Sequence, residues 1–169
     1  MIHFQPFERT DFYRLINWLS SEKELIQFAG PIFSYPLTND QLENYVDSIN
    51  RKVCKILLSE TNEVIGHCEF NYENEIPRIS RVLIGNQNYR SRGIGTEIIR
   101  NMSTEFFCDT RVSIIDLNVF AWNDGAIRCY EKLGFQIVKT TVFEKEIDGE
   151  FWENHNMQLT RHNFDLIQR

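Results

Sequence analysis

The sequence contains no long hydrophobic run. Charged or polar residues interrupt every apolar stretch before it reaches the roughly 18–20 residues that a membrane-spanning helix needs. Residues 1–12 also lack the pattern of positive charges followed by an apolar segment that is typical of a secretory signal. We therefore expect a cytoplasmic protein with no membrane partner.

Cysteine and histidine are scarce and scattered. The four cysteines include no Cys-x-x-Cys pair, and the four histidines include no His-Glu-x-x-His motif. These absences argue against a disulfide framework and against a zinc site. We expect reduced, buried thiols and no bound metal. His67, which stands beside Cys68 in an expected strand, is predicted to be a packed structural residue.

An excess of positive charge is also missing. The chain carries 18 Lys and Arg residues against 24 Asp and Glu residues, which gives a formal net charge of −6. A nucleic-acid-binding surface needs the opposite sign, so we expect no nucleic-acid partner. The remaining composition, 42% hydrophobic and 25% charged over 169 residues, is typical of one globular domain that spans residues 1–169.

Hydrophobic periodicity and turn signals predict strands mixed with helices. Expected strands cover residues 2–7, 53–58, 64–72, 79–84, 114–119, 135–146 and 151–160, and expected helices cover residues 12–19, 22–28, 38–49, 93–107 and 126–133. Thr10 and Asp11 are expected to cap the first helix, Thr38 to open a capping box, and Asp148-Gly149 to form a hairpin turn. This order predicts an α/β (α+β) fold with a mixed sheet and helices on both faces.

The most informative stretch is Arg-Ser-Arg-Gly-Ile-Gly at residues 90–95, which joins an expected strand to an expected helix. Two glycines in a loop that enters a helix leave backbone N–H groups free to bind an anion, and the helix dipole adds to them. The P-loop motif is absent, and the dinucleotide fingerprint lacks its third small residue because Ile98 stands there. The remaining interpretations are a pyrophosphate loop of the Arg-x-x-Gly-x-Gly type and a helix-initiating turn with a basic patch.

A second motif favours the pyrophosphate loop. Residues 123–135 read Asn-Asp-Gly-Ala-Ile-Arg-Cys-Tyr-Glu-Lys-Leu-Gly-Phe and follow an expected strand. This motif resembles the second signature of the GCN5-related N-acetyltransferases (the GNAT superfamily), Asn-x-x-Ala-x-x-x-Tyr-x-x-x-Gly-Phe. The loop resembles the first signature, and the order and separation of the two also fit. The chain is most similar to the branch of ribosomal-protein-alanine and polyamine acetyltransferases.

This resemblance implies the GNAT fold, with a mixed, mostly antiparallel seven-stranded sheet, and acetyl-CoA as the cosubstrate. It also implies that backbone groups before the loop contact the thioester, that the loop holds the pyrophosphate and that the second motif contacts pantetheine. The cofactor-binding residues implied are Leu83, Ile84, Gly85, Arg90, Ser91, Arg92, Gly93, Ile94, Gly95, Thr96, Asn123, Ala126 and Tyr130. Either arginine side chain could instead face solvent, and Asn123 could also be a helix N-cap.

Acetyl transfer to an amine requires proton transfers. A free alkyl amine is protonated at neutral pH, since its pKa lies near ~10.4, and the leaving thiolate benefits from an acid. By resemblance Tyr130 is this acid, and the alternative is a tyrosine that packs against the sheet. Glu69 resembles the acidic strand residue of polyamine acetyltransferases, which makes it the candidate base, directly or through water. A glutamate that points to solvent is the equal alternative.

The predicted function is acetyl-CoA-dependent N-acetylation of a primary amine by direct attack on the thioester. The acceptor is a small amine such as a polyamine, or a protein N-terminus, and aminoglycosides stay open. A non-catalytic acyl-CoA-binding module on the same fold is the alternative of another class. The resemblance also allows a homodimer. Six aromatic residues are candidates for the acceptor pocket or for the core: Phe28, Phe33, Tyr35, Phe70, Tyr72 and Trp122.

Overall fold

The computed structural model describes residues 1–168, in which the backbone forms two compact units. Unit 1 comprises Met1–Glu73 and Ser80–Ile94, and unit 2 comprises Asn74–Ile79 and the chain from Gly95 onward. Seven strands are hydrogen-bonded in the order β1-β2-β3-β4-β5-β7-β6. The pairs β1–β2, β2–β3, β5–β7 and β6–β7 are antiparallel, and β4 and β5 run parallel. The predicted mixed, mostly antiparallel sheet is therefore confirmed.

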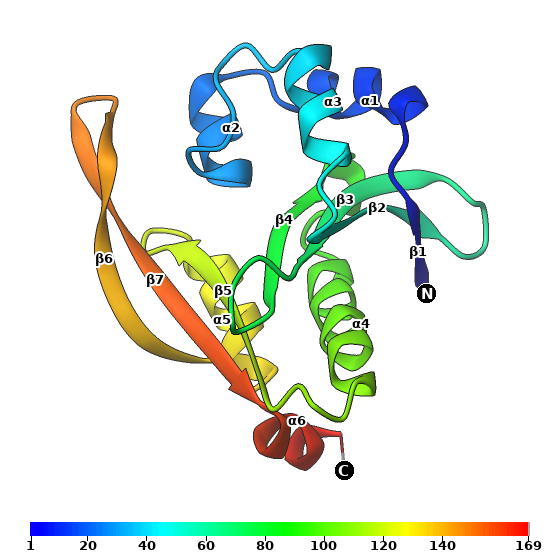
Figure 1. The fold of residues 1–169 in the computed structure, drawn as a ribbon, viewed down its shortest axis with the longest axis vertical. Coiled ribbons are helices and arrows are strands. Elements are labelled where there is room, and N and C mark those ends of the chain that lie inside the picture. The colour runs from blue at the N-terminus through cyan, green and yellow to red at the C-terminus, as the bar shows by residue number, and fades with distance from the viewer. Residues whose placement is uncertain (169) are drawn as a thin grey trace. The chain divides into compact units, whose positions relative to one another are not determined.

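Unit 1 combines strands from the N-terminal half of the chain with three short helices. Its elements are β1 (Ile2–Pro6), the 3₁₀ helix η1 (Arg9–Asp11), α1 (Phe12–Trp18), α2 (Glu22–Ala29), α3 (Asn39–Val46), β2 (Arg51–Leu58), β3 (Val64–Asn71), most of β4 (Arg78–Ile84) and the 3₁₀ helix η2 (Gln87–Tyr89). In Figure 1 the helices α1, α2 and α3 lie together. Their apolar faces bury a common cluster that includes Phe12, Leu25 and Leu42, and Leu83 of β4 packs against this cluster.

The sequence predicted caps at the N-terminal ends of α1 and α3, and the structure differs from the prediction at α1. The Thr38 hydroxyl accepts a hydrogen bond from Gln41 N at 3.4 Å, so Thr38 caps α3 as predicted. The predicted capping box is not completed, because Gln41 Oε1 accepts a hydrogen bond from Ser34 N at 2.7 Å instead. The predicted cap by Asp11 is wrong. A 3₁₀ turn precedes α1, and the capping box belongs to Glu8 and Asp11. The Asp11 carboxylate is buried and forms ion pairs with Arg14 at 2.6 Å and with Lys55 at 3.0 Å.

Unit 2 contains the C-terminal part of the sheet and three further helices. Its elements are α4 (Ile94–Cys108, from Gly95 onward), β5 (Ile114–Phe120), α5 (Asp124–Lys132), β6 (Gln136–Ile147), β7 (Glu150–Thr160) and α6 (Arg161–Ile167). The φ angles of Asp148 (53°) and Gly149 (83°) are both positive, which fits a type I′ hairpin turn and confirms the predicted hairpin. The sequence interpretation missed α6, which Thr160 caps through its side chain.

The strand β6 lies at one end of the strand order and is almost fully exposed. Its pairing with β7 is irregular at two places, between Ile137 and Lys139 and between Val142 and Glu146. Figure 1 shows the two strands as a long hairpin that leads into α6. Such irregularities are typical of a bulged strand at a sheet edge.

Within residues 1–168 no cysteine forms a disulfide bond, but the four cysteines differ in burial. Cys54 and Cys68 are buried and lie directly opposite each other in the β2–β3 ladder. Cys129 is half-buried and Cys108 is exposed, so the expectation that all four thiols are buried is wrong for these two. Cys108 is the last residue of α4.

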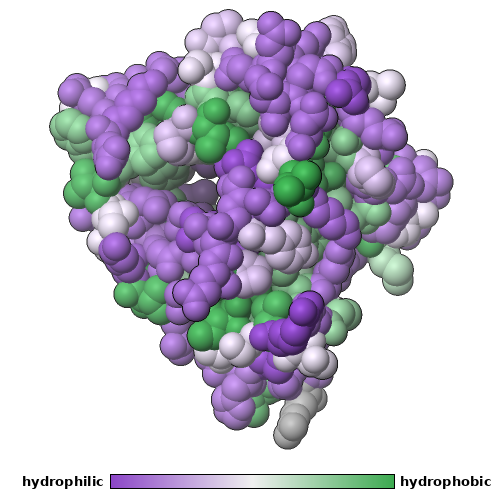
Figure 2. Space-filling model, in the orientation of Figure 1, coloured by the Kyte–Doolittle hydropathy of each residue, from purple (hydrophilic) through white to green (hydrophobic). Residues whose placement is uncertain are grey.

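The surface is mostly polar on the face drawn in Figure 2, with hydrophobic residues in separate areas. Among residues 1–168, no helix combines the length and hydrophobicity that crossing a bilayer requires. Within the same range, no group of three or more His, Cys, Asp or Glu residues is placed to hold a metal ion.

Candidate functional site

The end of β4 presents peptide groups whose directions are set by β3. Gly85 donates its N–H to the carbonyl of Ile65 in β3 at 2.9 Å. Along a strand, the N–H groups of alternate residues point to the same side. The N–H of Leu83 therefore also points toward β3, and the N–H of Ile84 points away from it. Among the three backbone contacts predicted here, Ile84 has the N–H that is directed away from β3.

Gly85 is required by the packing of Trp18, a contact that the sequence does not reveal. A Cβ atom at Gly85 would lie 1.9 to 2.3 Å from three ring atoms of the Trp18 side chain. Real Cβ atoms do not approach ring atoms so closely, so the indole of α1 covers the backbone at the end of β4 only because the residue there is glycine.

The loop after β4 has the backbone geometry of an anion-binding turn. Ser91 and Gly93 both have positive φ angles, 60° and 80°, and α4 begins at the next residue, Ile94. Alternation of left-handed residues with ordinary ones directs successive backbone N–H groups toward one side, which makes a concavity for anions. Residues 90–93 are exposed, so this concavity is open to solvent. A Cβ at Gly93 would meet no atom within 4 Å, so its backbone conformation rather than crowding favours glycine there.

Arg90 ties this loop to the end of β4. Its Nε donates to the carbonyl oxygen of Ile84 at 2.9 Å. The Arg90 side chain thus holds the loop next to the Ile84 peptide group. This hydrogen bond joins two predicted cofactor-binding segments of unit 1, the end of β4 and the loop that begins at Arg90. Arg92 is exposed, so its guanidinium lies in contact with solvent.

The first turn of α4 contacts α5 in unit 2. Thr96 Oγ1 and Cys129 Sγ lie 3.2 Å apart, within hydrogen-bonding distance for sulfur. Cys129 directly precedes Tyr130, the predicted acid. The residues after the loop and the second motif are therefore held together by a side-chain contact, with Gly95 one residue before Thr96.

Asn123 is the N-cap of α5. Its Oδ1 accepts a hydrogen bond from Ala126 N at 3.3 Å, so the N-cap role predicted for Asn123 is confirmed. The cap uses only the amide oxygen, and the side-chain NH₂ group keeps two donors of its own. Capping and a contact to a bound pantetheine amide are therefore compatible. The Ala126 N–H is engaged in the cap, which leaves its half-buried methyl group as the part that a ligand could touch.

Tyr130 lies in the last turn of α5 and is half-buried. Its ring packs near Phe135, with 6.1 Å between the ring centroids. Burial, with a smaller contribution from the neighbouring Cys129, raises the pKa of the Tyr130 phenol. The phenol therefore stays protonated at neutral pH and is able to donate a hydrogen bond, which is the state that an acid needs.

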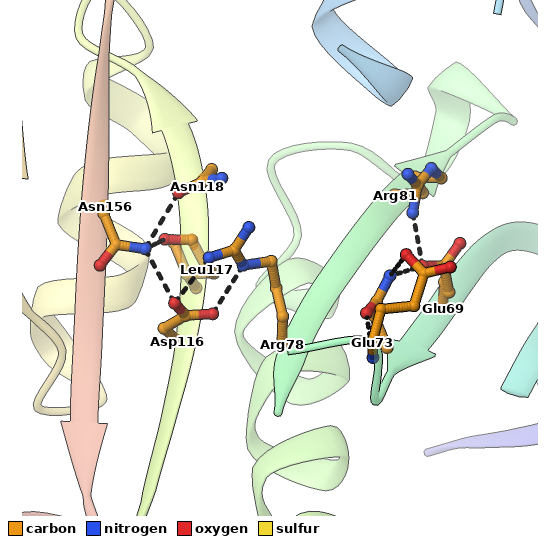
Figure 3. A network of polar contacts seen from close by, with 9 residues as sticks. Glu69, Glu73, Arg78, Arg81, Asp116, Leu117, Asn118 and Asn156 are labelled. Atoms are coloured by element: carbon orange, nitrogen blue, oxygen red, sulfur yellow. Dashed lines mark hydrogen bonds and ion pairs between the residues drawn. The ribbon is translucent and has the colours of Figure 1, made fainter. Parts of the chain in front are cut away.

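Glu69 is completely buried in β3, and Figure 3 shows the polar network around it. Its Oε1 accepts hydrogen bonds from Arg81 Nη1 and, at 2.8 Å, from Asn71 Nδ2. Its Oε2 has no hydrogen-bond partner among the described residues. The alternative of a solvent-facing glutamate is wrong, because the strand turns this side chain toward Arg81 of β4. One carboxylate oxygen is therefore committed to Arg81 and the other is free to accept a hydrogen bond.

Tyr45 and His67 continue this network into the core. The Tyr45 hydroxyl lies 3.1 Å from His67 Nε2, and the guanidinium groups of Arg51 and Arg81 lie 5.7 and 5.6 Å from the Tyr45 ring centroid. His67 also contacts the ring of Phe7, with centroids 4.6 Å apart. Burial and the charge of Arg81 lower the pKa of His67 to about 3, so its ring is neutral at physiological pH. The structural role predicted for His67 is confirmed.

Unit 2 holds the second network of Figure 3. Arg78 at the start of β4 forms a bidentate ion pair with Asp116 of β5, at 2.7 and 2.8 Å. Asn156 of β7 donates to Asp116 Oδ2 at 3.0 Å, and it also reaches Asn118 Oδ1 at 3.0 Å. The Asp116 carboxylate of β5 thus binds side chains from β4 and β7. These contacts fix the register of the three strands at the start of β4.

The sequence interpretation missed Trp18, Tyr45 and Arg81, whose roles depend on contacts between distant segments. Of the six aromatic candidates for the acceptor pocket, Phe28, Phe33 and Phe70 are buried. Tyr35, Tyr72 and Trp122 are 46, 47 and 44% exposed. The Trp122 ring packs against Phe120 and Trp152 in unit 2. Half of the candidates are therefore core residues, and the others reach solvent.

Comparisons with known proteins agree with this geometry. The profile of the acetyltransferase (GNAT) family matches residues 12–135. An aminoglycoside N(6')-acetyltransferase type 1 of Klebsiella pneumoniae is 26% identical over 140 residues, which cover 75% of this chain and 69% of that protein. The fold is similar to spermidine N-acetyltransferase from Vibrio cholerae in complex with CoA and spermine (TM-score 0.79, 19% identity, 96% of this chain and 97% of the other). It is also similar to aminoglycoside acetyltransferase AAC(6')-Ib in complex with coenzyme A (TM-score 0.78, 22% identity, 100% of both chains).

The contact between Gly85 and Trp18 predicts a strong coupling between these positions. Gly85→Ala should lower the free energy of unfolding by about 1–3 kcal/mol, because the new methyl group overlaps the indole. In a Trp18→Ala background the same substitution should cost much less. Urea denaturation of the wild type, both single variants and the double variant measures this coupling. An equal cost in both backgrounds would show that Trp18 does not restrict this position.

The neutral, buried His67 predicts a loss of stability in acid. Its pKa is about 3 in the folded protein against 6.5 in the unfolded chain, so the unfolded chain binds one more proton between these values. The contribution is complete above pH 6.5 and is lost as the pH falls toward 3, at up to about 1.4 kcal/mol per pH unit. Denaturation curves of His67→Phe should show a shallower pH dependence. The exposed His162, changed to Gln, is the control and should keep the wild-type slope.

Proposed function

The chain belongs to the acetyltransferase (GNAT) family, and on that premise we propose that it acetylates a small polycationic amine. It is an N-acetyltransferase with acetyl-CoA as its cosubstrate, which supplies an activated thioester. The observation that carries the assignment of the cofactor site is the exposed loop at residues 90–93, where left-handed Ser91 and Gly93 lead into α4. This backbone suits the diphosphate of CoA, because its N–H groups and the helix dipole favour negative charge.

In this proposal most of the loop binds the cofactor through its backbone. The backbone N–H groups from Arg90 to Thr96 donate hydrogen bonds to the pyrophosphate oxygens, and Gly93 and Gly95 carry no side chain that would block them. Arg90 holds the loop against the Ile84 carbonyl, and exposed Arg92 adds positive charge. Asn123 and Ala126 contact the pantetheine arm, through the free amide NH₂ group of Asn123 and the methyl group of Ala126.

The Ile84 N–H is the donor proposed for the thioester carbonyl. When the amine attacks the carbonyl carbon, its oxygen becomes an oxyanion, and a donor already aimed at that oxygen stabilises the transition state more than the ground state. Ile84 meets this need because its N–H points away from β3, whereas the Gly85 N–H already bonds to Ile65. Leu83 and Gly85 support this arrangement through their position on either side of Ile84.

Tyr130 is the proposed acid for the CoA thiolate. As the tetrahedral intermediate collapses, the carbon–sulfur bond breaks and negative charge develops on sulfur. The raised pKa of Tyr130 keeps its phenol protonated. Because an ordinary thiol has a pKa of about 8.5, the phenol donates a hydrogen bond to the developing thiolate more readily than it gives up its proton.

Glu69 is proposed to accept the proton of the attacking amine, directly or through water. Its buried Oε2 has no partner among the described residues, whereas Oε1 is held by Arg81 and Asn71. A buried acceptor without a partner is unfavourable unless a ligand or water satisfies it. An amine N–H at Oε2 would satisfy this oxygen and lead its proton away from the nitrogen that attacks.

The acceptor class follows from two considerations. The chain is net acidic, at −6, and such a surface attracts polycations from a distance. The relatives and neighbours named above act on aminoglycosides or spermidine, which carry several amines. We therefore favour a polyamine or an aminoglycoside over a protein N-terminus.

Thiol release from acetyl-CoA tests this function. The wild-type protein is given spermidine, spermine, kanamycin, an amino acid mixture and a peptide with a free N-terminus, each with acetyl-CoA, and free CoA is measured. Release stimulated by spermidine or kanamycin supports the proposal. Release stimulated only by the peptide would assign a protein N-terminus instead. Binding of acetyl-CoA without stimulation by any amine would overturn the proposed acceptor class.

Tyr130→Phe should lower kcat about 100-fold or more, because the thiolate loses its hydrogen-bond donor. The dissociation constant of acetyl-CoA, measured by calorimetry, should stay within about twofold, since the ring that packs near Phe135 is retained. Tyr13→Phe is the matched control, because Tyr13 is 80% exposed on α1. Unchanged turnover in Tyr130→Phe would remove the acid role.

Glu69→Gln should reduce kcat/KM for the amine, and the loss should shrink as the pH rises. Near neutral pH nearly all of the amine carries a proton that must be removed, whereas near pH ~10 much of it is already neutral. The measurement is a pH profile of kcat/KM between pH 7 and pH ~10 for the wild type and the variant. Glu73→Gln, in the same network but more exposed, is the control. A loss that is equal at every pH would indicate a structural role.

A further inference from the structure

Tyr45 of α3 meets His67 on a face of β3 that also carries Glu69. Side chains two residues apart along a strand point to the same side, so the imidazole and the carboxylate share this face. The Tyr45 hydroxyl lies 3.1 Å from His67 Nε2, and all three side chains are almost completely buried. The guanidinium groups of Arg51 and Arg81 lie 5.7 and 5.6 Å from the centre of the Tyr45 ring. The oxygen of the hydroxyl is therefore held in place, and only its proton is able to turn.

The imidazole of His67 has a single proton to place. Since burial and the charge of Arg81 lower its pKa to about 3, the ring is neutral at physiological pH and carries hydrogen on one nitrogen only. Nδ1 has no hydrogen-bond partner among the described residues. The rings of Phe7 and Phe28 lie against the imidazole, with centroids 4.6 and 5.4 Å away, and they offer no oxygen or nitrogen to an N–H. A buried N–H without an acceptor is rare and costly, so the geometry favours the proton on Nε2.

The tautomer of His67 decides where the Tyr45 hydroxyl directs its proton. A proton on Nε2 is donated to the Tyr45 oxygen, so the hydroxyl proton has to turn elsewhere. The carboxylate of Glu69 attracts this proton, because its negative charge acts on Tyr45. Burial and then this charge raise the pKa of the Tyr45 phenol well above its usual value, so the hydroxyl stays protonated. In the other tautomer the hydroxyl would donate to Nε2, and its proton would not be available to the carboxylate.

We propose that His67, protonated on Nε2, and Tyr45 are positioning residues that direct a hydroxyl dipole at the carboxylate of Glu69. This inference rests on the proposed function, because the dipole affects turnover only if Glu69 accepts the proton of the amine. A dipole with its positive end toward a carboxylate favours the ionised form, which is the form that is able to accept a proton. Neither Tyr45 nor His67 touches the reacting atoms. A carboxylate oxygen has two lone pairs, so Oε2 keeps one for the amine.

The other groups around the Glu69 carboxylate act on its charge in opposite directions. These groups are Arg51, Asn71, Glu73 and Arg81, and Figure 3 shows part of the set. The two arginines and the amide favour the ionised form, whereas burial and the like charge of Glu73 oppose it. Tyr45→Phe changes no charge in this network and keeps the aromatic ring beside the guanidinium groups. The substitution therefore isolates the contribution of the hydroxyl.

The tautomer of His67 is measured on the protein without any ligand. Long-range ¹H–¹⁵N correlation spectra of protein labelled with ¹⁵N-histidine distinguish a protonated ring nitrogen from an unprotonated one. The signals that are absent from His67→Phe identify His67. Near neutral pH we expect a protonated Nε2 and an unprotonated Nδ1. A proton on Nδ1, or an average of the two tautomers, would overturn the proposal, since the Tyr45 hydroxyl would then donate to His67.

The pH profile of kcat/KM tests the effect of the hydroxyl on turnover. In Tyr45→Phe the acidic limb should move to higher pH by about 0.5–1 pH unit, because Glu69 stays protonated over a wider range without the dipole. Along this limb kcat/KM should fall roughly 3- to 10-fold, and at higher pH it should approach the wild-type value. Ratios of variant to wild type remove the ionisation of the amine, which all proteins share. Tyr13→Phe, at an exposed position, is the matched control. An unmoved limb, or an equal loss at every pH, would contradict the proposal.

Two substitutions at His67 separate its donor from its packing. Glutamine places an amide NH₂ group near the position of the histidine Nε2, whereas methionine has the same length and no donor. His67→Gln should therefore keep the wild-type pH profile, and His67→Met should show the shift of Tyr45→Phe. A purely structural histidine would give the opposite order, because methionine suits an apolar environment better than an amide does. Equal profiles in the two variants would also overturn the proposal.

These measurements distinguish a failure of this inference from a failure of the proposed function. A wild type without amine-stimulated thiol release would remove the proposed acceptor, and the spectrum of His67 would then decide alone whether the histidine directs the hydroxyl. If the wild type is active and Tyr45→Phe has the wild-type pH profile, the positioning role fails while the proposed function stands. Should either His67 variant fail to fold, the spectrum of the wild type and the profile of Tyr45→Phe remain decisive.

Discussion

The buried negative charge of Glu69 is the constraint on which the arrangement of unit 1 depends. A carboxylate removed from water is costly unless a cation and hydrogen-bond donors accompany it, and here Arg81 and Asn71 provide both. Its neutralisation links β3 to β4, and the cation that performs it also lies against the Tyr45 ring. The hydrophobic core around His67 and the backbone at the end of β4 are therefore connected through one ion pair. A hydrocarbon pair at these positions would satisfy the core equally well, but it would provide no carboxylate oxygen for the proton acceptance that we propose for Glu69.

The groups that we propose to bind the cofactor are mainly backbone groups, and the side chains near them hold that backbone in place. Trp18 excludes any side chain at residue 85, and Arg90 donates a hydrogen bond to the Ile84 carbonyl. Asn123 caps the helix that carries Tyr130. Each of these side chains restricts a main-chain segment and so reduces the reorganisation needed when acetyl-CoA binds. In this proposal the specificity for an acyl-CoA is a property of the fold, whereas the choice of amine depends on a few charged side chains.

The sequence predicted those features that depend on neighbours along the chain. The loop at residues 90–95, the N-cap at Asn123 and the hairpin at Asp148 are local patterns, and all three elements were found where they were expected. The sequence did not predict the partners of Glu69, because Arg81 is twelve residues away and meets it through the pairing of two strands. The same reason applies to Trp18 and Gly85, which are far apart in the chain. Asp11 was assigned to a cap because one of its two cations, Lys55, becomes its neighbour only in the folded chain, although the other, Arg14, is only three residues away.

The exposed strand β6 has a consequence for the behaviour of the protein in concentrated solution. An unpaired strand edge is a template on which other chains can add strands and grow into aggregates. Two irregular stretches interrupt the pairing of β6, and its sequence places charges at Lys139, Glu144, Lys145 and Glu146. A second chain that approaches this edge meets a kinked backbone and charges that would lose water, so its addition is opposed at several points. The bulges and charges of β6 thereby help to keep separate copies of the chain from joining into a continuous sheet.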